Sequence, residues 1–423
     1  MPELGHECAD GRNAPGIGMP GGAGGAAALL SAASADGWGG VDLLRRCPVD
    51  RRNFLRVSGV GGAVAAFGGA SWLAAFRSGA AAGESPYGAP AGPDANGVSL
   101  PPGFTSRIVA RSGQPVAGTS YVWHPAPDGG ACFADGPGWI YVSNSEISGS
   151  GGVGAIKFGG DGAILGAHRT LSGTNLNCAG GATPWNTWLS CEELEGGAVF
   201  ETDPWGLRPA VRLPEMGLFT HEACAVDTDR RVVYMTEDRP DGRFYRFVPA
   251  VWPVLMAGRL EVLVENDGNV SWREVPDRSG ATAPTRHQVP ESKTFHGGEG
   301  CYYAGGTCWF TTKGDNRVWA LDAANNRLSV AYDGDAELSG VDNVTGAANG
   351  DLFVAEDGGD MQICLISGGV VAPFLQVHDS DGSEITGPAF NPAGNRLYFS
   401  SQRGTTGSSG DGITYEVTGP FRR

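Results

Sequence analysis

Residues 173–193 bring together two kinds of side chain that a mixed metal site requires. Cys178 lies in a glycine-rich turn, and a short apolar run then ends in two adjacent carboxylates, Glu192 and Glu193. A thiolate favours transition metals, whereas carboxylates suit Ca²⁺, Mg²⁺ and Fe³⁺. We therefore expect Cys178 to bind a transition metal beside any calcium that the acidic residues bind.

Further carboxylates recur along the chain, each in a short link that precedes an apolar run. They are Glu222 in THEACAVD, Glu299 in FHGGEGC, Asp342 in SGVDNVT and Glu384 in SEITGPAF. Most acidic residues of a protein are simply exposed, so this pattern needs elements that bring the side chains together. Two histidines in these links, His221 and His296, are candidates either for bases or for structural residues.

The elements that must position these residues are six similar apolar segments. Each contains β-branched or aromatic residues and ends in polar or acidic ones, and their starts are separated by 48, 45, 76, 43 and 45 residues. A period of about 45 residues with several short strands per repeat is typical of β-propeller blades. The segments lie at 139–146, 187–193, 232–239, 308–317, 351–358 and 396–404.

We therefore predict an all-β, six-bladed β-propeller over residues 103–423, with an insertion near 250–295. The inner strands of a propeller line a central channel, so blades far apart in sequence can direct carboxylates into one axial pocket. Such clustering is unfavourable unless cations neutralise the charges. A two-sheet sandwich is the alternative fold, but it does not account for six evenly spaced repeats.

Composition and charge limit the classes of partner. The chain has 69 Gly and 27 Pro among 423 residues and a formal net charge of −16, which disfavours a nucleic-acid partner. Seven of the nine cysteines follow residue 82, an odd number, so at least one thiol stays unpaired or binds metal. Among these seven, Cys301 and Cys308 could pair across a hairpin.

The N-terminal region is expected to be an export signal. Arg51 and Arg52 precede a weakly apolar, Gly- and Ala-rich run, and small residues up to Ala82 permit cleavage there. A membrane anchor is the alternative, but the run is poor in Leu and Ile. We predict a twin-arginine signal region at 1–82 that is removed or disordered, a linker at 83–102, and a mature protein without a stable membrane span. The twin-arginine export machinery would be a partner, and the protein would be periplasmic, extracellular or on the cell surface.

Several long motifs resemble the PhoX-type alkaline phosphatase family. They include TNLNCAGGATPWNTWLSCEE, THEACAVD, FHGGEGC, FTTKGDNRVWALD, VAED and EITGPAF, and the resemblance covers roughly residues 100–423. It implies a metal-dependent hydrolase of small-molecule phosphomonoesters on a six-bladed propeller. It also implies an Fe³⁺ pair on the axis, with Ca²⁺ ions alongside.

The resemblance implies roles for ten residues. Cys178 would bind or bridge iron, Asn144 would contact the phosphate, and with Glu299 these two would be the catalytic residues. Glu192, Glu222 and Glu299 would be metal carboxylates. Further ligands, chiefly for calcium, would be Glu193, Asp342, Glu356, Asp357 and Glu384.

One position departs from the family pattern. Better-known members have an arginine two residues before the metal-binding glutamate, where this chain has Gly297 before Glu299. Another cation would have to replace it; the candidates are Arg239, Arg317, Arg403, Lys313 and His296. The departure leaves two alternatives open, a non-catalytic calcium-stabilised propeller that binds a ligand or partner, and an oxidoreductase or lactonase-like propeller.

Overall fold

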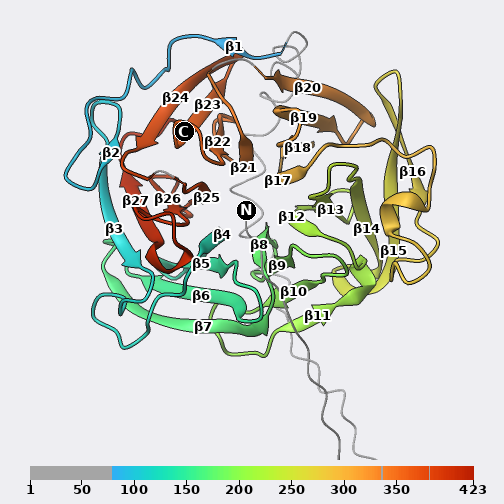
Figure 1. Ribbon diagram of the computed structural model, residues 1–423, viewed down its shortest axis with the longest axis horizontal. Helices are drawn as coiled ribbons and strands as arrows, with labels where there is room; N and C mark the ends of the chain where they lie inside the picture. The colour runs from blue at the N-terminus through green and yellow to red at the C-terminus, as the bar shows by residue number, and fades with distance from the viewer. Residues whose placement is uncertain (1–78, 335–336, 381) are drawn as a thin grey trace, which may run out of the picture. The chain divides into compact units, whose positions relative to one another are not determined.

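Short runs of β-branched and aromatic residues, separated by Gly-rich turns, form 27 strands in the computed structural model. The structure describes residues 79–334, 337–380 and 382–423, which contain no α-helix and three short 3₁₀ segments. No helical segment in these ranges is long and apolar enough to cross a membrane. The sheets surround a central axis, with one strand of each meander innermost (Figure 1).

Three of the sheets are four-stranded. The first two are simple meanders, β4-β5-β6-β7 and β8-β9-β10-β11. The third, β25-β26-β27-β3, joins the C-terminal strands to an N-terminal one, so it links the two ends of the described chain. Their strands are β4 (Pro127–Asp135), β5 (Gly138–Ser145), β6 (Gly151–Phe158), β7 (Ile164–Thr174), β8 (Asn177–Ala182), β9 (Trp188–Glu192), β10 (Val199–Thr202), β11 (Val211–Leu213), β25 (Ile385–Phe390), β26 (Arg396–Ser401), β27 (Ile413–Thr418) and β3 (Thr105–Arg111).

A fourth sheet contains the meander β21-β22-β23-β24, and two short strands from the region before residue 103 pair with β24. Its strands are β21 (Val341–Gly346), β22 (Leu352–Glu356), β23 (Gln362–Ser367), β24 (Val370–Val377), β1 (Ala81–Ala82) and β2 (Val98–Ser99). The 3₁₀ segments are η2 (Pro214–Met216), η3 (Thr285–His287) and η4 (Ser409–Asp411). The twin arginines and apolar run of the expected export signal lie outside the described residues.

The fifth sheet has nine strands and corrects the prediction of six separate blades. It joins the meanders β12-β13-β14-β15-β16 and β17-β18-β19-β20 edge to edge through a single pair, Asn269 with Arg327. The residues expected to form an insertion supply the long hairpin that makes this contact. The strands are β12 (His221–Asp227), β13 (Val232–Glu237), β14 (Phe244–Val251), β15 (Val254–Asn266), β16 (Asn269–Glu274), β17 (Gly298–Ala304), β18 (Thr307–Thr312), β19 (Arg317–Asp322) and β20 (Arg327–Asp333).

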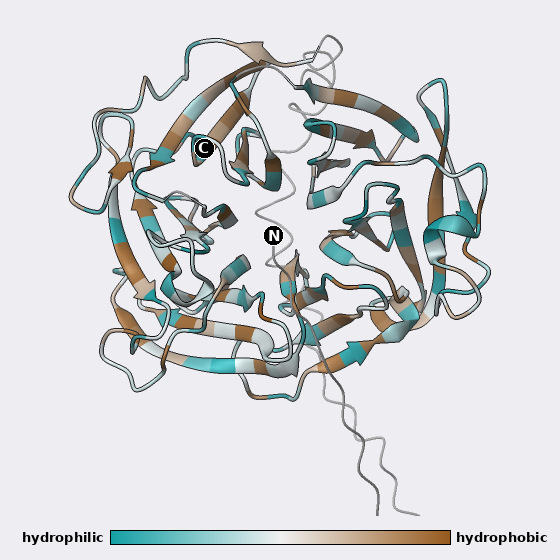
Figure 2. Cartoon of the chain, viewed as in Figure 1, coloured by the Kyte–Doolittle hydropathy of each residue, from teal (hydrophilic) through white to brown (hydrophobic). Residues whose placement is uncertain are grey.

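The all-β, propeller-like arrangement is confirmed. The innermost strands contact one another in a closed ring, β4-β8-β12-β17-β21-β25 and back to β4. Apolar side chains alternate with polar ones along many strands (Figure 2) and pack between neighbouring sheets. For example, Phe353 and Phe374 pack against Phe104 and Phe421 from the two ends of the described chain. This packing holds the six inner strands at fixed positions around the axis.

Candidate metal centre

A β-bulge recurs near the beginning of the inner strands. In five of them, the first residue of the inner strand pairs with the last residue of the neighbouring strand. The next regular pair lies three residues further along the inner strand but only two residues back along its neighbour, so the inner strand contains one extra residue. The residue that follows the first pair therefore leaves the regular ladder, and bulges re-aim side chains in this way. These five bulge residues are Asp128, Cys178, Glu222, Glu299 and Asp342.

A second set of positions lies directly after the strand that pairs with each inner strand. The backbone N–H of each such residue donates a hydrogen bond to the carbonyl of the residue directly before the inner strand. For Glu193, the acceptor is the carbonyl oxygen of Leu176, at 2.8 Å. The second set thus lies beside the bulge residues. Its members are Glu146, Glu193, Asp238, Lys313, Asp357 and Gln402.

Small residues after the bulge let the inner strands approach the axis closely. A Cβ atom on Gly129 would lie 2.5 Å from the Cα of Ala179 on the next inner strand. On Gly300, it would lie 2.5 Å from the backbone nitrogen of Val344. Real Cβ contacts are not this short, so both glycines are required for the ring to be this narrow, and the narrow ring brings the bulge side chains together.

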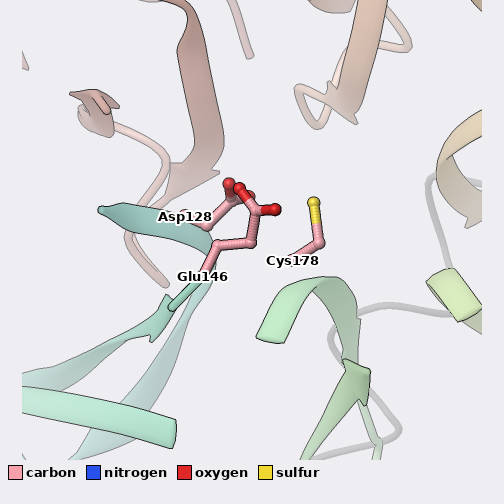
Figure 3. A group of neighbouring side chains, drawn as sticks. All are labelled: Asp128, Glu146 and Cys178. Atoms are coloured by element: carbon pink, nitrogen blue, oxygen red, sulfur yellow. The ribbon is translucent and has the colours of Figure 1, made fainter. Parts of the chain in front are cut away.

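The bulge residues and their neighbours form four overlapping groups of possible metal ligands. Within each group, one ligand atom per residue lies within 4.8 Å of the others. Figure 3 shows the first group, in which the Asp128 and Glu146 carboxyls lie side by side and the Cys178 thiol points toward the same space. The groups are Asp128, Glu146 and Cys178; Cys178, Glu193 and Glu222; Glu222, Glu299 and Asp342; and Asp342, Asp357 and Glu384.

Burial makes this cluster unfavourable for negative charge unless cations are bound. Glu222 is 0% exposed, and neither of its carboxyl oxygens has a hydrogen-bond partner in the part of the chain that the structure describes. Burial, and secondly the charge on Glu299, raise the pKa of Glu222 well above its usual value. A fully buried carboxyl without a partner aims into a space that a cation would fill.

Most other members of the cluster show the same upward shift, whereas Lys313 and a hydrogen bond with Glu384 lower the pKa of Asp357. Burial and the neighbouring Asp128 and Glu222 charges raise the pKa of the Cys178 thiol. Burial is also the main cause that raises the pKa of Glu193 to about 9 and that of Asp342 to about 7. Bound cations would reverse these shifts, because metal ligation requires the deprotonated thiolate and carboxylates.

Three polar side chains of the protein partly compensate the cluster. Gln402 donates from Nε2 to Asp128 at 2.5 Å and to Glu146 at 2.7 Å, which holds these two carboxyls together. Arg403 forms an ion pair with Glu384 at 2.8 Å. Lys313 lies between Glu299 and Asp357, with its Nζ at 3.0 and 3.1 Å from their oxygens.

The structure brings together seven of the nine residues expected to bind metal. Glu192 and Glu356 lie outside the four groups, because their carboxylates accept backbone N–H donors of the adjacent loops. Glu192 binds the N–H groups of Asn175 and Ala198 at 3.0 and 3.2 Å. Glu356 binds those of Ser339 and Gln362 at 2.8 and 3.0 Å. Of the Glu192–Glu193 pair, only the second residue reaches the groups.

Sequence reasoning missed Asp128 and Glu146. Glu146 directly follows the strand of the first apolar segment, just as Glu193 and Asp357 follow the strands of the second and fifth segments. The repeat pattern could therefore have identified Glu146 as a candidate ligand. Asp128 lies in PAPDGG, where no apolar run marks the start of β4. The register of the bulge is what relates Asp128 to Cys178 and Glu222.

Asn144 lies behind Cys178 and does not face the ligand groups. Its Nδ2 donates to the carbonyls of Cys178 and Ala179 at 2.9 and 2.8 Å, and its Oδ1 accepts from Trp188 and Ser190, both at 2.9 Å. The side chain is 0% exposed. All its polar atoms are used within the protein, so the expected contact with phosphate has no free donor.

Similar bonds reach two other inner strands from the second strand of the preceding meander. The Thr236 hydroxyl donates to the carbonyl of Glu299, and that of Thr311 donates to the carbonyl of Asp342. In each case the donor belongs to one meander and the acceptor is a bulge residue of the next. We infer that Asn144 is a positioning residue that fixes the backbone of Cys178.

Replacing Asn144 with alanine is expected to lower the free energy of unfolding by about 3 kcal/mol, because two carbonyls, an indole N–H and a hydroxyl lose their partner. Urea denaturation would measure this change, with the exposed Asn395→Ala as control. Turnover should fall while KM stays unchanged. A raised KM at unchanged stability would instead support a direct phosphate contact.

Fold and site together define the class of this protein, a β-propeller-like protein with an acidic centre and one thiol near its axis. The family model described as "Alkaline phosphatase PhoX" matches residues 143–204 and 195–332. These matches span 190 of the chain's 423 residues and indicate a PhoX-like phosphatase. The search of functionally curated proteins returned no match.

Comparison with solved structures gives a match of the same fold. PhoX of Pseudomonas fluorescens, in complex with vanadate, a transition state analogue, is 16% identical with a TM-score of 0.64, over 81% of this chain and 98% of that one. A gluconolactonase from Xanthomonas campestris is 12% identical with a TM-score of 0.47, over 79% of this chain and 99% of the other. The first likeness supports the propeller-like fold.

Proposed function

We propose that this phosphatase hydrolyses phosphomonoesters with an iron pair and calcium ions held on the axis of its propeller-like fold. The observation that carries the proposal is the fully buried Glu222, which has no hydrogen-bond partner among the described residues and is shared by two of the four ligand groups. The groups contain eight carboxyls and a single thiol. This donor set suits hard cations throughout, with one position for a transition metal.

The proposed ligands divide along the row of groups. Cys178 belongs to the two groups at one end, so iron would be held there with Glu193 and Glu222. The two groups without a thiol, which share Asp342, offer only oxygen atoms and suit calcium. Clustered cations of this charge bind phosphate oxygens, neutralise developing charge and lower the pKa of a bound water.

The residues of the chain contribute order and charge. The backbone carbonyls of the bulge residues accept hydrogen bonds from side chains of the neighbouring meander, so the ligand side chains need little rearrangement before binding. Gln402 keeps Asp128 and Glu146 adjacent. Preorganised charge of this kind is worth most where water is excluded, and the burial of Glu222, Glu299 and Asp342 provides that environment.

Export is part of the same proposal. A twin-arginine signal would carry the protein across the membrane already folded, after its metals had bound. Cleavage after Ala82 would remove β1, which pairs with Val370 and Val371, and would leave β2 in place. The mature protein would then meet phosphoesters in the periplasm or outside the cell.

An assay panel on natively exported protein would test the proposal. Metal content would be measured by mass spectrometry, and phosphomonoesters, phosphodiesters and lactones would be offered to the same sample. We expect bound iron and calcium, a preference for monoesters and loss of activity on chelation. Undiminished monoester hydrolysis by iron-free protein would disprove the role of iron, and preference for lactones would disprove the substrate class.

A further inference from the structure

Lys313 is the one cation in the second set of positions around the axis. Three of the five other members carry a carboxylate in the ligand groups, whereas Lys313 extends an ammonium toward them. Its Nζ lies 3.0 Å from Glu299, 3.1 Å from Asp357 and 4.0 Å from Asp342. These three residues belong to two adjacent groups, so Lys313 lies where those groups meet.

The turn that carries Lys313 is fixed by the backbone. Its N–H donates to the carbonyl of Gly297, and that of Gly314 donates to the carbonyl of His296, both at 2.8 Å. A Cβ atom at Gly314 would lie 2.8 Å from the His296 oxygen, so the close approach requires glycine there. The lysine therefore starts from a defined point beside Glu299, and only its flexible stem is free to move.

Lys313 retains capacity to bind a further anion. An ammonium has three N–H donors, and the contacts with Glu299 and Asp357 engage two of them. The side chain is 35% exposed, whereas that of Glu299 is 3% exposed. One donor thus remains available on the solvent side of two buried ligand groups, where a substrate held by their cations would arrive.

The neighbouring arginines are less suited to this task. Arg239 pairs with Glu195, which lies outside the four ligand groups, and that carboxylate is itself 52% exposed. Arg403 reaches only Glu384, at the end of the row. Among the described cations with recorded ion pairs, Lys313 alone contacts members of two groups.

We propose that Lys313 is the phosphate-binding cation of this site, and that its ammonium donates to a non-bridging oxygen of the phosphoryl group while its stem stays anchored beside Glu299. The assignment rests on the proposed function. Cations bound to Glu299 and Asp357 would weaken their hold on the ammonium, so that loading the site prepares the lysine for substrate. A charge-assisted hydrogen bond of this type favours the dianionic phosphoryl group over neutral parts of the substrate.

Equilibrium binding of inorganic phosphate to the metal-loaded protein would test this assignment. Calorimetry would compare wild type with Lys313→Met, Lys313→Arg and the control variant Arg239→Met. Mass spectrometry would give the metal content of each protein. We expect Lys313→Met to bind phosphate at least about tenfold more weakly with its metals retained. Lys313→Arg should recover most of the affinity, and Arg239→Met should match wild type.

Two outcomes would overturn the assignment. Phosphate affinity of Lys313→Met within about twofold of wild type, at unchanged metal content, would make Lys313 an internal counterion only. An additional bound cation with unchanged phosphate affinity would show that the lysine merely occupies a metal position. If Lys313→Met does not fold, Lys313→Gln gives the same comparison. Failure of the proposed function itself would be distinct, because wild type would then hydrolyse no monoester whatever Lys313 does to phosphate binding.

Discussion

Replacing Cys178 with alanine is expected to lower phosphatase activity at least about a hundredfold, because loss of a ligand should exceed the effect of losing a residue that only supports one. Cys178 is the single thiol in the four groups and belongs to two of them. Its removal takes away the one soft ligand and leaves Glu222 and Glu193 with oxygen neighbours only. Iron content should fall with activity, whereas calcium should remain.

The measurement is metal content and turnover on the same preparation. Cys132→Ala is the matched control, since Cys132 is a free, half-buried cysteine on β4, like Cys178 in exposure, and belongs to none of the groups. Cys178→Ser is a second comparison, because a hydroxyl keeps the size of the side chain but is a poor ligand for iron at neutral pH. Full activity of Cys178→Ala with unchanged iron would rule out the thiol as a ligand.

The second large effect is that metal-free protein should lose stability as the pH rises. Burial raises the pKa of Glu193 to about 9 and that of Asp342 to about 7. The folded state therefore binds these protons more tightly than the unfolded state, whose carboxyls titrate near pH 4. A carboxyl of this kind stabilises the folded state fully when the pH is below its pKa in the unfolded chain. This stabilisation is lost as the pH rises through its pKa in the folded protein.

The expected loss between pH 5 and pH 9 is on the order of several kcal/mol, since one pKa unit corresponds to about 1.4 kcal/mol for each group. Thermal unfolding of chelated protein at pH 5, 7 and 9 would measure it. Restoring calcium and iron should remove most of the slope, because bound cations replace the protons. A melting temperature that rises with pH in the metal-free protein would contradict the prediction.

Glu222→Gln should separate the charge from the packing of this cluster. The amide keeps the shape of the side chain but removes one buried carboxylate, so the metal-free variant should be more stable than wild type at pH 9. It should also bind less metal and lose activity. Glu291→Gln is the control, because this carboxylate is 54% exposed in an ion pair of 3.7 Å and should change neither property.

The fold could be predicted to a considerable extent from the chain's repeats. Apolar segments at a period of about 45 residues indicated strands around an axis, because strand formation depends on local pattern and turn residues. The same repeats did not indicate that two meanders share one sheet. That contact depends on Asn269 and Arg327, which begin two strands far apart in sequence.

The sequence by itself determined which chemistry is available: one cysteine in a glycine-rich turn, and carboxylates such as Glu222 and Glu299 at the entries of strands. Tertiary structure decided which of them meet. A single bulge register turns Asp128 and Cys178 toward the axis, whereas Glu192 and Glu356, one position away from Glu193 and Asp357, turn back to bind their own loops. The reason is physical: successive residues of a strand point to opposite sides, so a shift of one residue separates a ligand from a loop anchor.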